Sequence, residues 1–162
     1  MMMSQNPKKL FPEVIKMEKN RRDLKSFSML VLLLVALDAI LKIVTVCLKG
    51  LPVVEQIPEG MSADTVKIIS AILFVLGFVV FLPQIYVGLK GMKIADGAKC
   101  TKAFIVWTVI LLVIAAIATF SALSEMFKTF NFDNVLNFVS PALDVIIFAY
   151  IFVFARKIAG AK

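Results

Sequence analysis

The sequence predicts an all-α membrane protein, a transmembrane four-helix bundle with up-down-up-down connectivity. Sixty per cent of the 162 residues are apolar, and most of them gather into four blocks. Each block is long enough to cross a hydrocarbon core of about 30 Å as a helix of roughly 20 residues. The apolar residues run continuously rather than alternating, which favours helices over the strands of a barrel. The four expected spans are residues 26–48, 66–89, 103–123 and 135–155.

The segments outside the spans are short. Residues 1–25 form a basic leader and residues 156–162 a basic tail. The leader carries apolar residues at helical spacing, including Leu10, Val14 and Met17. It is therefore either an interfacial helix on the inner leaflet or a plain extension that holds the topology. The first span exceeds the apolar core of a secretory signal, about 7–15 residues, which favours an uncleaved anchor.

The distribution of basic residues sets the orientation in the membrane. Fourteen Lys and Arg residues fall in the leader, in the connection at 90–102 and in the tail, whereas three fall in the other two connections. By the positive-inside rule, the larger group faces the cytoplasm, so both termini are expected there. Topology and contact with anionic lipid headgroups explain the net charge of +7. No nucleic-acid partner is expected.

Three charged residues lie inside the predicted spans. Asp38 is near the middle of the first span and Asp144 near the middle of the fourth, which puts the two at nearly one depth. Lys42 lies one helical turn beyond Asp38, at a spacing that lets opposite charges meet. Its side chain should point back toward the N-terminus, to the depth of Asp38. We therefore expect the first and fourth spans to touch, with Lys42 between the two carboxylates.

These charges have two interpretations. On insertion scales each costs about 2.5–3.5 kcal/mol at mid-helix, so each must be paired, hydrated or protonated. Either the Asp38–Lys42–Asp144 network only fixes the register of the helices, or a surplus carboxylate binds a proton or cation that is coupled to transport. The first interpretation is favoured because a partner charge is available within the chain.

Prolines and small residues bear on how the spans pack. Pro83 and Pro141 are expected to kink their helices, since proline removes a backbone donor. Small residues let a neighbouring helix approach closely. The candidates are Ala115, Ala118 and Ala122 on the third span and Gly77 on the second.

The connections carry signals for helix ends. Ser62 or Asp64 is a candidate N-cap for the second span. The connection at 90–102, which includes Gly91, is predicted as a tight basic turn. The three phenylalanines of the connection at 124–134 suit either the membrane–water boundary or packing under the end of the bundle, and the second is favoured.

Enzymatic, metal and cofactor sites are not indicated. The chain has no histidine for general-base work at neutral pH, no P-loop and neither a G-x-S-x-G nor an H-E-x-x-H motif. With no histidine and two cysteines, a zinc or haem site is not expected. Cys47 and Cys100 belong at opposite faces of the membrane, too far apart for a disulfide.

Two stretches resemble known families. Tyr86–Ala95 followed by Lys102–Trp107 is similar to the central hairpin of small uncharacterised four-span membrane proteins of Gram-positive bacteria. That resemblance implies a bacterial cytoplasmic membrane and carries no activity with it. Phe81–Ile85, with its Pro83–Gln84 pair, resembles the PQ-loop transporters, whose three-helix units assemble in pairs to carry small solutes. This chain has an extra first helix and no second Pro-Gln pair.

From these features we expect a small multi-pass protein of the bacterial cytoplasmic membrane. Its expected mode of action is association with copies of itself, with a partner membrane protein or with lipid. The alternative is a proton- or cation-coupled transporter of small solutes that works as an oligomer, with Asp38 and Asp144 as the coupling carboxylates. No enzyme activity, cofactor or metal is expected.

Overall fold

The computed structural model describes residues 7–50 and 62–160, and all regular structure in these residues is helical. Four stretches are long and apolar enough to cross a membrane, with α2 and α3 counting as one. The predicted all-α fold with four spans is confirmed. The helices are α1 (Pro7–Lys49), α2 (Ala63–Val79), α3 (Phe81–Ala95), α4 (Lys102–Lys128) and α5 (Phe132–Gly160).

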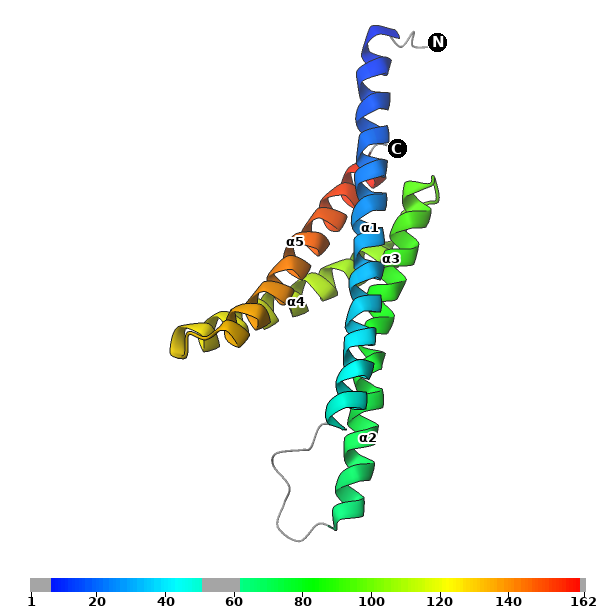
Figure 1. The fold of residues 1–162 in the computed structure, drawn as a ribbon. Helices are drawn as coiled ribbons and strands as arrows, with labels where there is room; N and C mark the ends of the chain where they lie inside the picture. Colours follow the sequence, from blue (N-terminus) through cyan, green and yellow to red (C-terminus); the bar gives the residue numbers. More distant parts are fainter. Residues whose placement is uncertain (1–6, 51–61, 161–162) are drawn as a thin grey trace.

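The leader and the first span form one helix. α1 runs without a break for 43 residues, and in Figure 1 its first part extends straight beyond the other helices. The choice between an interfacial helix and a plain extension stays a prediction. The side chain of Leu10 and most of the first connection, residues 51–61, lie outside the described residues.

The second span is interrupted. It begins at the expected N-cap, because the Ser62 hydroxyl accepts a hydrogen bond from the backbone N–H of Thr65 at 3.3 Å. α2 then ends at Val79 and α3 begins at Phe81. The break lies just before Pro83, whose missing N–H leaves a carbonyl one turn earlier without its donor. Pro141, in contrast, lies inside the continuous helix α5.

The predicted turn at 90–102 is wrong in its first half. α3 continues to Ala95, so Gly91 is helical and only residues 96–101 connect α3 to α4. The chain reverses at Gly97, which has a φ of +109°, a conformation that favours glycine. Thr101 then caps α4 by accepting from the N–H of Phe104 at 3.4 Å. The basic residues placed in this turn therefore lie partly on the last turns of α3.

The spans pack over only part of their length. α1 lies along α3, and α4 lies along α5, so the chain forms two antiparallel pairs. α1 also contacts α5, and α3 contacts α4. Figure 1 shows that the two pairs meet near the start of α4 and the end of α5 and then splay apart. The side of the membrane that each end faces stays a prediction.

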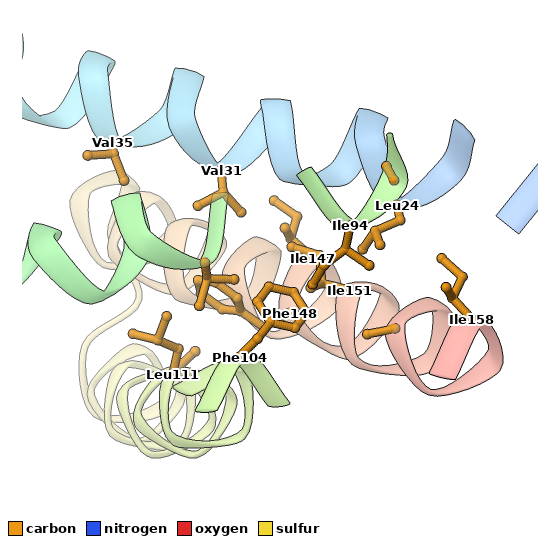
Figure 2. Close-up of a cluster of buried hydrophobic side chains, with 14 of the residues drawn as sticks. Leu24, Val31, Val35, Ile94, Phe104, Leu111, Ile147, Phe148, Ile151 and Ile158 are labelled. Atoms are coloured by element: carbon orange, nitrogen blue, oxygen red, sulfur yellow. The ribbon is translucent and has the colours of Figure 1, made fainter. Parts of the chain in front are cut away.

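The hydrophobic core lies where the two pairs meet (Figure 2). α1, α3, α4 and α5 all contribute buried apolar side chains to it. Phe104 of α4 and Phe148 of α5 are the largest of the fully buried ones. On α1 and on α4 the buried positions recur at spacings of four, three and four residues, the pattern of helices that interlock side by side. The α4 set is Phe104, Thr108, Leu111 and Ala115.

Candidate functional site

The buried face of α1 continues into charged residues. Along this helix the buried positions follow one another at intervals of four, three and four residues. Continuing the same rhythm by three and then four residues reaches Asp38 and Lys42, so both lie on the side that faces the core. We call this row the α1 stripe: Leu24, Ser28, Val31, Val35, Asp38 and Lys42.

α5 shows the same change from apolar to charged. Its buried row runs back from Ile158 through Ala155 and Ile151 to Phe148. The next position on that row is Asp144, one turn earlier in the sequence. Both core-facing rows therefore become charged toward the splayed ends of the helices.

The described part of the chain leaves this charged region uncovered. Among the described residues, none of α1 beyond Val35 and none of α5 before Ile147 is buried. Asp38 and Lys42 are exposed, and Asp144 is half-buried. We call the region the open core and define it by these three charged residues, which continue the core-facing rows beyond the last buried positions of α1 and α5.

The structure puts the two predicted acids on contacting helices. α1 and α5 are in contact, which confirms the expected meeting of the first and fourth spans. The charges of Asp38 and Asp144 are close enough to interact, and being alike they repel each other. Two carboxylates thus lie on the core-facing rows of two spans that contact each other.

Lys42 has partners other than the two acids. Its Nζ donates a hydrogen bond to the carbonyl of Gly77 at 3.3 Å and lies 4.4 Å from the centroid of the Phe81 ring. No ion pair joins it to Asp38 or Asp144 within the part of the chain that the structure describes. The structure therefore does not place the ammonium between the acids, and the three-residue network stays a prediction.

The break in the second span explains the position of Lys42. Gly77 is in the last turn of α2, where backbone carbonyls lack donors within the helix and carry partial negative charge. An ammonium group supplies both a donor and the opposite charge. A Cβ at Gly77 would be 3.8 Å from Nζ, which is ordinary contact, so this glycine lies beside Lys42 rather than against another helix backbone.

The predicted small-residue face of α4 is partly used. Ala115 is buried in the core, Ala122 is half-buried and Ala118 is exposed. Thr119, between them, donates its hydroxyl to the carbonyl of Ala115 at 2.7 Å. Of the three alanines, Ala115 therefore contributes most to the packing of α4.

α1 and α3 approach each other closely at two glycines that were not predicted as packing positions. A Cβ at Gly88 of α3 would stand 2.7 Å from the Cγ of Leu32 and 3.1 Å from the carbonyl oxygen of Ser28. A Cβ at Gly91 would collide with the Oγ of Ser28. The signal was present as Gly88-x-x-Gly91-x-x-x-Ala95, a run of small residues on one helix face.

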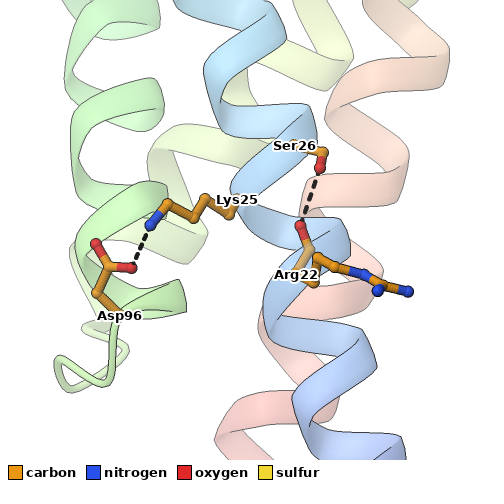
Figure 3. A network of polar contacts seen from close by, with 4 residues as sticks. All are labelled: Arg22, Lys25, Ser26 and Asp96. Atoms are coloured by element: carbon orange, nitrogen blue, oxygen red, sulfur yellow. Dashed lines mark hydrogen bonds and ion pairs between the residues drawn. The ribbon is translucent and has the colours of Figure 1, made fainter.

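Polar contacts lie at the other end of the core (Figure 3). Lys25 of α1 forms an ion pair with Asp96, at the end of α3, at 2.7 Å. One turn earlier, the carbonyl of Arg22 accepts a hydrogen bond from the Ser26 hydroxyl at 3.1 Å. Both side chains of the ion pair are more than half exposed, so its contribution to stability is small, about 0–1 kcal/mol.

Two of the three phenylalanines near the turn between α4 and α5 are exposed, and the side chain of Phe132 lies outside the described residues. Phe127 is 79% exposed and Phe130 is 82% exposed. Packing under the end of the bundle, which the sequence favoured, is therefore wrong for these two rings. Their exposure fits the membrane–water boundary instead.

The described residues contain no cluster of metal ligands. Across residues 7–50 and 62–160, no three His, Cys, Asp or Glu side chains come close enough to hold a metal ion.

In comparisons with known proteins, no family model, no curated protein and no solved structure matches the chain. The two resemblances noted in the sequence stay predictions.

Proposed function

We propose that this multi-pass protein acts by associating, within the membrane, with another membrane-embedded chain through the open core. The observation that carries this proposal is the exposure of Asp38 on a stripe that is buried one turn earlier, at Val35. A charged group facing lipid at mid-helix costs about 2.5–3.5 kcal/mol. A protein surface that covers the open core removes that cost, which gives association a driving force.

The small extent of internal packing also supports association. In the most apolar part of the first span, and likewise of the second, 11% of the residues are buried, against 22% in the third and in the fourth. Lipid covers an apolar helix face as well as another helix does. Lipid does not cover a carboxylate, so the open core differs from the rest of the exposed surface.

We further propose that the protein lies in a bacterial cytoplasmic membrane with both ends in the cytoplasm. The beginning of α1, the turn between α3 and α4 and the end of α5 lie toward one end of the molecule (Figure 1). The fourteen basic residues of the larger group lie in these segments or next to them in the sequence, and they also suit contact with anionic headgroups. A non-enzymatic role without a cofactor is part of this proposal.

Transport coupled to a proton or cation is the second candidate function. It is favoured by the interrupted span, because broken helices with free carbonyls at mid-membrane line the ion sites of many transporters. Here the carbonyl of Gly77 accepts a hydrogen bond from the ammonium of Lys42, and the two acids lie on the contacting helices α1 and α5. Four spans leave little room for a pathway, so this function requires an oligomer.

Photo-crosslinking from two matched positions tests the association. Leu41, one turn beyond Asp38, is 53% exposed, and Ile114 on α4 is 54% exposed. A photoreactive amino acid at Leu41 should give a discrete protein adduct in membranes, and the adduct should disappear in an Asp38→Asn background. The same amino acid at Ile114 should label lipid only. Lipid labelling alone at both positions would contradict association.

Flux measurements separate the second function from the first. In liposomes, Asp38→Asn and Asp144→Asn should leave the thermal unfolding profile in place. If either variant abolishes a proton or cation flux while the adduct at Leu41 persists, transport is the function. If no flux exists and the adduct is lost, association is the function.

A further inference from the structure

We propose that the open core binds a transmembrane helix from a different protein, one that carries a single Lys or Arg near mid-membrane. The basic side chain of this helix would lie between Asp38 and Asp144. This inference rests on the proposed function and deepens it by naming the chemistry of the partner.

Within the described residues, neither of the two acids forms an ion pair. Lys42, the nearest basic residue in sequence, donates to the Gly77 carbonyl and lies over the Phe81 ring. The ion pairs within the described residues are Lys25–Asp96 and Lys67–Asp64, and neither includes Asp38 or Asp144. Asp38 and Asp144 are therefore two like charges on contacting helices, and neither forms an ion pair within the described residues.

One shared cation satisfies both acids. Two carboxylates that repel each other are stabilised together by a single positive charge between them, and the gain is larger in a medium of low dielectric than in water. Exposed leucines flank the acids on both helices, namely Leu37 and Leu41 on α1 and Leu143 on α5. The surface thus offers apolar contact around a negative centre, which matches an apolar helix with one basic residue.

A second copy of this chain fits the surface less well. Lys42 is the one basic residue in the interior of the predicted spans, since the others lie at span ends or in the connections. A second copy could offer only this residue, which is already engaged, and it would add two more acids. A lipid headgroup cannot serve either, because it stays at the membrane surface rather than at mid-depth.

Binding of synthetic helices to the reconstituted full-length protein tests the inference. The probe is a leucine-based transmembrane peptide with one central Arg, and energy transfer between labelled peptide and labelled protein in liposomes reports binding. The Arg peptide should bind, and a central Gln should weaken binding about tenfold, the scale of one polar contact between membrane helices. Moving the Arg to the terminal turn of the peptide should weaken binding equally.

Variants of the protein provide matched controls. Asp38→Asn and Asp144→Asn should each weaken binding of the Arg peptide, whereas Asp38→Glu, which keeps the charge, should retain it. Asp64→Asn removes a carboxylate that is exposed at the start of α2 and should leave binding unchanged. Thermal unfolding of each variant shows whether a loss of binding arises from misfolding, and the Glu variant keeps the test valid if an Asn variant does not fold.

The outcomes separate this inference from the proposed function. Equal binding of the Arg and Gln peptides, or binding that survives neutralisation of both acids, overturns the inference. Energy transfer between two labelled copies that depends on Asp38, with no binding of the Arg peptide, also overturns it and makes a second copy the occupant. In both cases, a photo-crosslinked adduct at Leu41 would still support association within the membrane. Absence of that adduct would contradict both the inference and the proposed function.

Discussion

The Oγ of Ser28 on α1 occupies the space into which any residue other than glycine at position 91 of α3 would place its Cβ. The neighbouring Gly88 faces the same helix at Leu32 and at the backbone of Ser28. The two helices can approach this closely because neither glycine has a side chain. The α1–α3 pair, which carries one side of the open core, is therefore held in register by these two positions.

Adding a methyl group at Gly91 should weaken this pair. Gly91→Ala places a Cβ against Ser28 Oγ, and it leaves 3.0 Å to the Ser28 Cβ. We expect a loss of about 1–3 kcal/mol in the free energy of unfolding, the range for overpacking a tight contact, measured by SDS titration in mixed micelles. Gly77→Ala is the control, because its Cβ would meet only Lys42 Nζ at 3.8 Å. Similar losses for the two variants would contradict this account.

Removing the Ser28 hydroxyl should not destabilise the protein. Its Oγ is buried and has no hydrogen-bond partner among the described residues, and a buried hydroxyl without a partner costs about 1–3 kcal/mol. Ser28→Ala should therefore keep or raise stability in the same titration, and it should reduce the loss caused by Gly91→Ala. A clear destabilisation by Ser28→Ala would mean that the hydroxyl is satisfied.

Replacing Lys42 should loosen α2 against α1. Lys42→Met removes the donor for the Gly77 carbonyl and the charge over the Phe81 ring. Spin labels at Ile43 on α1 and Ile72 on α2, both half exposed, should then show a broader distance distribution than in the parent. The labels require a background in which both native cysteines are replaced.

Two further variants define the reason for that effect. Lys42→Arg keeps a cationic donor and should keep the narrow distribution. Lys67→Met removes a lysine whose side chain is 77% exposed and should change nothing. If Lys42→Met also keeps a narrow distribution, the contact with Gly77 does not hold α2 in place.

The four spans and one cap were predictable because they depend on local properties. Long apolar runs specify membrane helices by length alone, and Ser62 has the residue type and position of an N-cap. The end of α3 was misplaced because charge and glycine at 90–102 suggested a turn. That error put Gly91 outside the helix and concealed its role in packing.

The partner of Lys42 and the splay of the helices depend on tertiary geometry. A lysine one turn from an aspartate can reach that carboxylate or a carbonyl on a neighbouring helix, and sequence spacing describes only the first choice. The interruption of the second span at Val80 supplies such a carbonyl, that of Gly77. The angle between the helix pairs follows from how side-chain ridges fit at the crossing, which the apolar pattern of each span does not specify.

The stacked rings between α1 and α5 should contribute to holding the two pairs together. Phe27 stacks on Tyr150 with centroids 4.9 Å apart and lies 6.0 Å from Phe154. Phe27→Leu keeps apolar volume but removes both ring contacts, so we expect a loss of about 0.5–1.5 kcal/mol per pair in the SDS titration. Phe120→Leu, at a ring that is 74% exposed, should cost almost nothing. Phe27 packs against the core without being fully buried in it, so an unchanged stability would show that the buried core of Figure 2 alone joins the two pairs.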